Sequence, residues 1–461
     1  MHFRSLVVIL LALWAGPAAA ASVLLVSVDG MKPEYVLGDE SRQLNIPTLR
    51  GLAAEGAYAE GVTGIWPTVT YPSHTTLLTG VAPAVHGIYN NLEFDPERHF
   101  SASWFWYARQ IRVPTLWQAA HAGGLTTASI GWPVSVGAKD VDYLIPEYWR
   151  NFGAPAELNP SDRYLIAELS RPVGLLTQMQ AELGPYMMGN DTSSNGDEIK
   201  TRFAVDMLRR LKPAFMTLHL SSLDEAEHEH GPFSAPANRN LEAIDVMLAR
   251  LAEAARANDP NTAIVVVSDH GFATLTHRIN LYVPFLKAGL MTATVDPGTK
   301  SRQITGWRAE PWLAGGMAAI MLRDPGDART LSEVGTLLRA LQRDPANGIA
   351  TILDRDALVR VGAFPDASFV VVFQPGFYAG AEMSGDLVTP IAARNGGEAP
   401  GGHGFSPADA SMRAAFFAAG SGIAHHRDLG VIDMRQIAPT VARLLSVPMP
   451  TAPAAPLELA R

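Results

Sequence analysis

Several short stretches of this sequence place acidic, histidine and threonine side chains where metal-assisted chemistry would need them. They occur in LLVSVDG, WPTVTYPSHTTLLTG, SSLDEAEHEHGP, AIVVVSDHGF and GGHGF. The side chains of interest are Asp29, Thr70, Asp224, His228, Asp269, His270 and His403. Carboxylates and imidazoles are ligands that Zn²⁺ accepts. Three aspartates, three histidines and one hydroxyl suffice for two metal sites and a nucleophile. The set indicates hydrolytic phosphoryl chemistry, because two metals can hold both the attacking and the leaving oxygen.

The motifs differ in how strongly they argue against a purely structural role. Asp224 and His228 stand four residues apart, which places both on one face of a helix. The glutamates that alternate there would also suit a solvated face, and His230 is a competing ligand. Adjacent Asp269 and His270, directly after an apolar run, are the stronger signal. The Asp-Gly pair after the first apolar run and the lone histidine in GGHGF are weaker signals, since turns and exposed loops also explain them.

The stretch WPTVTYPSHTTLLTG predicts an extended loop that continues into a helix. Pro72 suits the first helical turn, and the amides at the start of a helix point toward an anion. A hydroxyl at this position can lose its proton and attack phosphorus. The residues alone leave four hydroxyls open as the nucleophile: Thr68, Thr70, Ser73 and Thr75. The neighbouring His74 is more typical of a structural core histidine than of a base.

Apolar runs of strand length lead into the acidic motifs. The run SVLLVSV ends at Asp29, AFMTLHL precedes Asp224, and AIVVVS ends at Asp269. Runs that are nearly continuously apolar, rather than alternating, are typical of strands buried on both faces, and the helical patterns between them imply a mostly parallel sheet. Ligands of such sheets gather at the carboxyl ends of the strands. We therefore predict an α/β fold in which these acidic side chains share one site.

The composition of the chain indicates where the protein is located and which kinds of molecule it binds. Residues 1–21 combine Arg4, a short apolar run and an Ala-x-Ala pattern, so we expect a cleaved signal peptide. This favours a periplasmic or secreted protein with no membrane span in its mature form. The chain has no cysteine, and its net charge of −9 comes without a basic stripe. Disulfides are thereby excluded, and binding of nucleic-acid duplexes is not expected. A small phosphorylated substrate suits the composition, because bound metals would supply the positive charge.

The length suits one large α/β domain, residues 22–446, better than a string of small domains. Two stretches, at about 98–200 and 275–400, fit the alternation of strands and helices poorly, and we expect them to form inserts that cap the site. The Pro/Ala-rich tail, residues 447–461, should be loosely held.

Taken together, the motifs resemble those of the nucleotide pyrophosphatase/phosphodiesterase family of the alkaline phosphatase superfamily, over residues 23 to about 445. The resemblance implies a three-layer α/β/α sandwich with a mostly parallel central sheet, an inserted cap and two zinc ions. The family's nucleophile is a threonine before an aromatic-Pro pair, which matches Thr70 before Tyr71-Pro72. One zinc ion would be held by Asp224, His228 and His403, and the other by Asp29, Asp269, His270 and Thr70.

The same resemblance assigns an oxyanion-binding asparagine and a reaction. HGIYNNLEFDP matches the stretch that carries this residue, with the register at Asn91 rather than Asn90. The implied reaction is hydrolysis of nucleotide-type phosphodiesters or pyrophosphates through a phospho-threonine intermediate. Asn91 and the Tyr71 backbone amide would stabilise the non-bridging oxygens. Two departures touch neighbours of ligands: Phe405-Ser406 replaces a common Tyr-Asp, and Glu227 replaces a common Gly.

Substrate contacts and the choice of substrate are the more open part of the interpretation. Tyr71 would stack on a nucleobase with Tyr148 opposite, or both rings simply pack the cap. No Arg or Lys lies close to the nucleophile motif, which favours diesters over monoesters, unless the cap donates a cation such as Lys139, Arg150 or Lys200. The alternatives are a phosphomonoesterase or phosphonate hydrolase with the same metals and, from a different class, a non-catalytic zinc-stabilised binding protein. The Cys/Ser-x-Pro-x-Arg motif of sulfatases is absent from the sequence.

Overall fold

The computed structural model describes residues 22–38, 44–97, 103–149, 162–187, 191–295, 302–393 and 399–460. The expected signal peptide, residues 1–21, lies outside the described residues. Among the helices in these ranges, none combines the length and the apolar character needed to cross a membrane.

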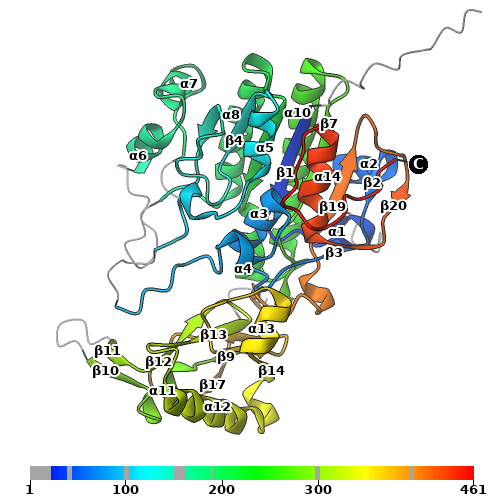
Figure 1. The fold of residues 1–461 in the computed structure, drawn as a ribbon. Helices are drawn as coiled ribbons and strands as arrows, with labels where there is room; N and C mark the ends of the chain where they lie inside the picture. The colour runs from blue at the N-terminus through cyan, green and yellow to red at the C-terminus, as the bar shows by residue number, and fades with distance from the viewer. Residues whose placement is uncertain are drawn as a thin grey trace, which may run out of the picture.

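An eight-stranded sheet forms the middle of the larger lobe, in the order β20-β2-β19-β7-β1-β6-β4-β5 (Figure 1). Its strands are β1 (Val23–Val28), β2 (Ala57–Tyr58), β4 (Thr127–Ile130), β5 (Tyr143–Ile145), β6 (Phe215–Leu220), β7 (Ala263–Val267), β19 (Phe416–Ala419) and β20 (Arg427–Asp428). All pairs from β7 to β5 are parallel, while β19 runs antiparallel to both of its neighbours. The mostly parallel sheet predicted from the apolar runs is confirmed.

Helices cover both faces of this sheet and complete the three layers. One face packs against α2 (Pro47–Glu55), α8 (Ser194–Arg210) and α10 (Ala235–Asn258). The other face packs against α3 (Thr70–Thr79), α5 (Leu116–Ala122) and α14 (Ile437–Leu444). Shorter elements are α1 (Glu34–Leu37), α4 (Pro83–His86), α6 (Asp162–Leu169), α7 (Leu175–Leu183) and the parallel pair β3 (Gly61–Thr63) and β21 (Val431–Asp433).

Burial on both faces explains why the strand sequences are apolar at most positions. In β1, Leu24 and Val26 belong to the core shared with α10, whereas Val23 and Leu25 belong to the core shared with α14. Successive side chains of a strand point to opposite faces, so no position of β1 meets water. Burial of each such side chain stabilises the fold by about 1.5–3 kcal/mol.

A second lobe, below the large sheet in Figure 1, follows β7 in the sequence. Its four-stranded antiparallel sheet has the order β12-β13-β15-β14. The elements are β9 (His277–Ile279), α11 (Tyr282–Lys287), β10 (Met291–Val295), β11 (Arg302–Trp307), β12 (Ala309–Leu313), β13 (Met317–Leu322), α12 (Ala328–Gln342), β14 (Ile349–Asp354), α13 (Arg355–Val361), β15 (Phe369–Phe373), β16 (Phe377–Ala379) and β17 (Val388–Pro390). The chain leaves the larger lobe through β8 (Ala273–Thr274) and returns through β18 (Gly401–Gly402), which pair with each other. The lobe thus occupies most of the stretch 275–400.

The stretch 98–200 is only partly separate from the central sheet. It contributes β4 and β5, which extend the sheet beyond β6, and the first part of α8. We expected an insert over the whole stretch. Its strands are too short to show the pattern of a buried strand, because β4 reads only TASI and β5 only YLI.

The tail packs against the larger lobe, in contrast to the expectation of a loosely held segment. Leu457 and Leu459 are buried in the core shared with α14. The Leu457 amide donates to Thr440 Oγ1 at 2.8 Å, and the Ala424 amide donates to Leu459 O at 2.8 Å. Two leucines at alternate positions therefore hold a segment whose Pro/Ala-rich composition suggested a loose one.

Candidate active site

Asp29, Asp269 and His270 meet at the carboxyl ends of β1 and β7. Their ligand atoms lie within 4.8 Å of one another. His270 Nε2 is 3.4 Å from Asp29 Oδ1 and 3.2 Å from Asp269 Oδ2. The backbone amides of Gly30 and His270 donate to Asp269 Oδ1 at 3.1 and 3.0 Å, which leaves Oδ2 directed into the group. Gly30 has φ +74°, and a Cβ there would lie 2.6 Å from the Phe272 ring, so the turn after Asp29 requires glycine.

Asp224, His228 and His403 form a second group, between helix α9 (Ser222–His230) and the loop after β18. His228 Nε2 lies 3.4 Å from Asp224 Oδ2, and His403 Nε2 lies 3.7 Å from Asp224 Oδ1. The Nδ1 of each histidine faces a backbone carbonyl, Gly401 O at 3.2 Å for His228 and Thr68 O at 3.0 Å for His403. Each Nδ1 therefore donates, and each Nε2 presents its lone pair toward Asp224, as metal-ligating histidines do.

His270 connects the two groups into one cluster. Its Nε2 is 4.0 Å from Asp224 Oδ1, and its ring stacks on His403 with centroids 3.6 Å apart and planes 9° apart. Asp224, His270 and His403 consequently also lie within 4.8 Å of one another. His228 stands at the rim of this cluster, with 33 % of its side chain exposed. The structure thus brings together all six Asp and His residues that the motifs singled out.

The two departures from the family pattern do not add a ligand. Glu227 is buried, turns toward Tyr35 and accepts a 2.8 Å hydrogen bond from its hydroxyl, and burial raises the pKa of Glu227 well above its usual range. Phe405 is buried as well, and its carbonyl accepts a hydrogen bond from Thr68 Oγ1 at 2.7 Å. Gly401 allows the loop to approach α9, because a Cβ there would lie 2.6 Å from Glu227 O.

The cluster suits a divalent cation. Four buried ligand atoms have no hydrogen-bond partner in the described parts of the chain: Asp29 Oδ1, Asp224 Oδ1, Asp269 Oδ2 and His270 Nε2. An unpaired buried polar atom costs about 1–3 kcal/mol, and more when it is charged. They belong to two groups of mutually close ligand atoms that share His270, so cations held by these groups would satisfy them. Carboxylate oxygens with imidazole nitrogens form a donor set typical of zinc.

Burial and mutual repulsion shift the pKa values of the ligands in the directions that such a cation would correct. Burial, and then the charge of Asp224, raises the pKa of Asp29 well above its usual range. Burial, and then the charge of Asp29, raises the pKa of Asp269. Burial lowers the pKa of His403 to about 4, and burial with His403 nearby lowers the pKa of His270. His270 and His403 are therefore neutral near pH 7, while Asp29 and Asp269 ionise at a cost in free energy that a neighbouring positive charge would offset.

The segment that carries Thr70 lies against both groups. Helix α3 begins at Thr70, whose carbonyl accepts from His74 Nδ1 at 2.9 Å, and that nitrogen is 3.5 Å from Asp269 Oδ2. Two residues earlier, the Thr68 carbonyl faces His403 Nδ1. The start of α3 is thus held between a residue of each group.

The four candidate hydroxyls differ in access. Thr68 donates to Phe405 O, Thr75 donates to Tyr71 O at 2.8 Å, and both side chains are buried. Ser73 is buried too. Thr70 is partly exposed, and its hydroxyl makes no hydrogen bond to any residue that the structure describes.

Asn91 is held beside Thr70 by the first turn of α3. Its Oδ1 accepts from the Tyr71 amide at 2.9 Å, and its Nδ2 has no protein partner among the described residues. Asn90 instead donates through its own Nδ2 to Leu313 O at 2.8 Å, which anchors the loop. We expected the Tyr71 amide to face a phosphoryl oxygen. In this structure the Tyr71 amide donates to Asn91 Oδ1 instead, so the Asn91 Nδ2 group is the donor that remains available for a phosphoryl oxygen.

The two tyrosines expected to contact substrate lie in a packed aromatic cluster. The Tyr71 ring is 1 % exposed, with the rings of Trp104 and Trp106 centred 5.1 and 6.2 Å away. Tyr148 packs on Trp106 at 5.3 Å. The ring of Tyr71 as placed here has no open face, so stacking on a nucleobase would require Trp104 or Trp106 to move.

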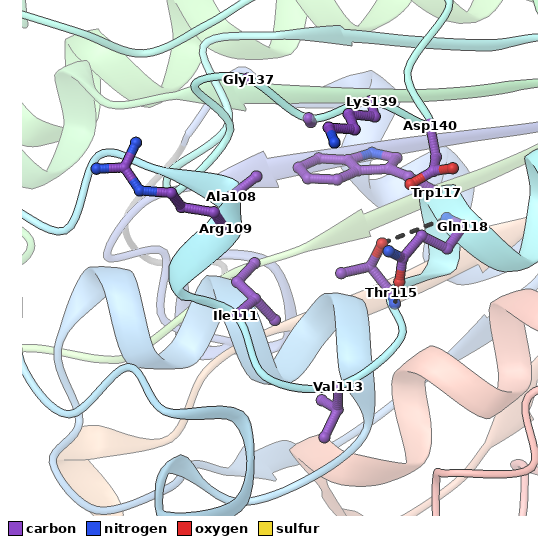
Figure 2. A pocket seen from close by; sticks show the side chains of 11 residues that line it. Ala108, Arg109, Ile111, Val113, Thr115, Trp117, Gln118, Gly137, Lys139 and Asp140 are labelled. Atoms are coloured by element: carbon purple, nitrogen blue, oxygen red, sulfur yellow. Dashed lines mark hydrogen bonds between the residues drawn. The ribbon is translucent and has the colours of Figure 1, made fainter.

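The basic residues considered for the cap do not reach the ligand cluster. Lys200 is buried, pairs with Asp197 at 3.0 Å, and donates to the carbonyl of His219 at 3.1 Å. Lys139 lines a separate cavity of about 230 Å³ together with Trp117, and Figure 2 shows that none of the metal-ligand candidates borders it. The third, Arg150, lies outside the described residues.

Two residues that no motif revealed lie directly behind the cluster. His219, in β6, places Nε2 2.9 Å from Asp29 Oδ2 and Nδ1 3.0 Å from Glu147 Oε2. The other oxygen of Glu147 accepts from the Tyr71 hydroxyl at 2.6 Å. One sequence signal for His219 existed, since a histidine inside the apolar run AFMTLHL must find buried partners. Glu147 stands among aromatic residues and gave no comparable signal.

Comparison with characterised proteins finds relatives that share part of their length with this chain. Rat ectonucleotide pyrophosphatase/phosphodiesterase family member 3 is 25% identical over 264 residues, which is 54% of this chain and 24% of the relative. The venom phosphodiesterase of Naja atra is 22% identical over 264 residues, covering 55% of this chain and 26% of the relative. The match therefore spans about a quarter of the length of these relatives.

Solved structures share the fold over nearly the whole chain. Human ectonucleotide pyrophosphatase/phosphodiesterase 5 superposes with a TM-score of 0.62 at 19% identity, covering 93% of this chain and 95% of that one. An inactive threonine-to-alanine variant of the murine protein in complex with AMP gives 0.61 at 19% identity, covering 93% and 96%. The alkaline-phosphatase-like α/β fold is thereby confirmed. The family model described as "Type I phosphodiesterase / nucleotide pyrophosphatase" matches residues 23–350. The motifs, the fold and this match agree, and the chain belongs to the type I phosphodiesterase / nucleotide pyrophosphatase family.

Proposed function

We propose that this protein hydrolyses nucleotide-type phosphodiesters or pyrophosphates, with two zinc ions held by the Asp/His cluster and Thr70 as the nucleophile. The observation that carries the proposal is the convergence of unpaired carboxylate and imidazole atoms beside the one partly exposed hydroxyl of the four candidates. Family membership supports the reaction class. The complex of a structural neighbour with AMP supports a nucleotide-type substrate.

The residues of the chain would act as follows. Asp224, His228 and His403 would hold one ion, and Asp29, Asp269 and His270 the other, with Thr70 completing the second set. Bound zinc would lower the pKa of a coordinated hydroxyl and offset the negative charge of the phosphoryl group.

Thr70 Oγ1 would attack phosphorus in line, which forms a phospho-threonine ester as the leaving oxygen departs, and water would then release the phosphoryl product. The positive end of the α3 dipole favours the anionic group at this position. Asn91 Nδ2 would donate to a non-bridging oxygen, since its Oδ1 is already committed to the Tyr71 amide.

The charge of the site favours diesters. Among the described residues, no Lys or Arg side chain contacts the ligand cluster: Lys200 pairs with Asp197, and Lys139 lines a separate cavity. A monoester dianion carries an additional negative oxygen that would lack a partner, and an unpaired charge in a desolvated site is costly.

The test combines metal content with turnover. Purified protein should contain two zinc ions per chain by elemental analysis and should hydrolyse bis(p-nitrophenyl) phosphate. EDTA should abolish this activity and zinc should restore it. Zinc content without turnover on a panel of phosphoesters would favour the binding-protein alternative. At most one metal in active protein would contradict the two-ion assignment.

A further inference from the structure

A chain of hydrogen bonds runs from the ligand cluster to the aromatic residues that cover Tyr71. Asp29 Oδ2 faces His219 Nε2 at 2.9 Å. His219 Nδ1 is 3.0 Å from Glu147 Oε2 and 3.1 Å from Gly131 O. Glu147 Oε1 accepts from the Tyr71 hydroxyl at 2.6 Å. Both ring nitrogens of His219 are therefore engaged with oxygen atoms, Nδ1 with two and Nε2 with one.

The members of this chain have little freedom to move. The backbone of His219 is paired with Ser27 of β1, and its ring packs against His74 with centroids 4.5 Å apart. The side chains of His219 and Glu147 are 3 % and 11 % exposed. Glu147 comes shortly after β5, the last strand of the sheet, so the sheet fixes the position of the Glu147 backbone. The rotamer of the histidine is consequently set by packing as well as by hydrogen bonds.

The hydrogen bond between His219 Nε2 and Asp29 Oδ2 sets the orientation of the Asp29 carboxylate. Oδ2 is committed to His219, while Oδ1 has no hydrogen-bond partner within the described ranges and faces His270 Nε2 at 3.4 Å. The terminal torsion of an aspartate is broad, so a carboxylate without such a partner samples many orientations. A fixed carboxylate binds a cation without first losing that freedom, which is why partners of metal ligands influence affinity.

Glu147 uses its two oxygens for two different parts of the site. One oxygen holds the partner of Asp29, and the other holds Tyr71, the residue next to Thr70. A single carboxylate therefore ties the nucleophile segment to a metal-ligand candidate on another strand.

We propose that His219 and Glu147 are positioning residues, which hold Asp29 in the orientation that receives a metal ion and set the start of α3 relative to it. This inference rests on the proposed function, because it requires the cluster to bind metal.

The first measurement is zinc affinity, determined by titration against a competing chelator. His219→Ala should weaken one of the two zinc sites by about 10–100-fold and leave the other nearly unchanged. Glu147→Ala should weaken the same site less, because His219 still reaches Asp29. The double variant should resemble His219→Ala alone, since residues that act through one chain are not additive.

The second measurement separates positioning from a loss of folded protein. Turnover of a diester by His219→Ala should rise toward the wild-type value as free zinc is raised, and kcat should recover with little change in KM. A general structural defect would not respond to zinc in this way. If His219→Ala does not fold, Glu147→Gln serves instead, because it keeps the size of the side chain but places an amide donor near His219 Nδ1.

His86→Asn is the matched control. His86 is also a buried histidine, and it bonds Thr76 Oγ1 and the Ile88 amide on the α3–α4 side, away from the ligand cluster. This variant should lose stability and keep the zinc affinity of the wild type.

The outcomes distinguish the inference from the function on which it rests. Two zinc ions in the wild type with unchanged affinity in His219→Ala would overturn the positioning role alone. Additive losses in the double variant would overturn the link between Glu147 and His219. A wild type that binds no zinc would overturn the proposed function and this inference with it.

Discussion

Replacing Asp269 by Asn should change the stability of the metal-free and the zinc-loaded protein in opposite directions. The Oδ1 atom of Asp269 accepts from the amides of Gly30 and His270, and an Asn carbonyl can keep both bonds. The Oδ2 atom is buried, has no hydrogen-bond partner among the described residues and lies beside Asp29, whose charge helps to raise the pKa of Asp269. An Asn Nδ2 group in this place would donate to the Asp29 carboxylate.

The magnitude follows from the exchange of a repulsive contact for a hydrogen bond. A hydrogen bond to a charged group contributes about 1.5–3 kcal/mol, so the metal-free variant should unfold with a free energy higher by about 1–3 kcal/mol. With zinc present the order reverses. The wild type gains about 4.1 kcal/mol at a zinc concentration one thousand times its Kd, which exceeds the advantage of the metal-free variant, and the variant, which lacks the charged ligand, gains much less.

Urea unfolding of both proteins near pH 7.5, once with EDTA and once with zinc, tests this reasoning. Asp245→Asn is the control, because Asp245 is a buried carboxylate that accepts from the amides of Thr48 and Leu49, outside the ligand cluster. It should lose stability equally in both conditions. If Asp269→Asn were less stable than the wild type in EDTA, the reasoning from carboxylate repulsion would be refuted.

Three further predictions address the nucleophile, the substrate and the dependence on pH. Thr70→Ala should keep the fold and the bound zinc but lose nearly all turnover. Thr68→Ala should lose about 1 kcal/mol of stability, because its hydrogen bond to Phe405 O is lost, and should keep most of the activity. An inactive Thr68→Ala would show that the nucleophile has been assigned to the wrong threonine. For a matched diester and monoester, kcat/KM should favour the diester by at least about tenfold, or about 1.4 kcal/mol, and equal or reversed values would favour the monoesterase alternative. Burial lowers the pKa of His86 from 6.5 to about 3, so below pH 6.5 the unfolded chain takes up a proton that the folded state does not. The free energy of unfolding therefore decreases as the pH is lowered from 6.5 toward 3. His86→Asn should therefore shrink the difference in unfolding free energy between pH 7 and pH 5 by about 2 kcal/mol, and an undiminished difference would contradict the assignment.

The sequence predicted the parts of the fold whose physics is local. A strand such as β1, buried on both faces, is apolar at nearly every position, and this pattern is visible without a structure. The strands β4 and β5 were not predicted, because they are short and because β4 carries polar side chains that find partners inside the protein. Ser129 accepts a hydrogen bond from Thr217, and Thr127 donates one to Asp142. Polar residues satisfied by distant partners look like surface residues in a sequence.

The candidate site divides in the same way. The Asp and His residues could be found because each lies in a short motif at the end of a strand or on one helical face. Their grouping around metal ions remains a prediction about binding, although the structure places their side chains together. A histidine within an apolar run indicated that His219 has buried partners, but its contacts with Asp29 and Glu147 could not be predicted, because they depend on which residues lie across the sheet. The enclosure of Tyr71 by Trp104 and Trp106 likewise depends on how a loop folds back over α3.

The position of β1 in the middle of the large sheet has a consequence for how the chain reaches its native state. Val23 pairs with Phe215 of β6 on one side and with Ala263 of β7 on the other, so β1, the first strand in the sequence, can pair fully only after both later strands have been synthesised. Contacts so distant in sequence form slowly, because a long loop must close before they stabilise anything. During synthesis, a nascent chain that ends before Ala263 has a six-residue apolar strand with an unpaired edge. Fragments of this kind should aggregate readily, and expression of the protein should benefit from chaperones that shield the open edge until β7 arrives.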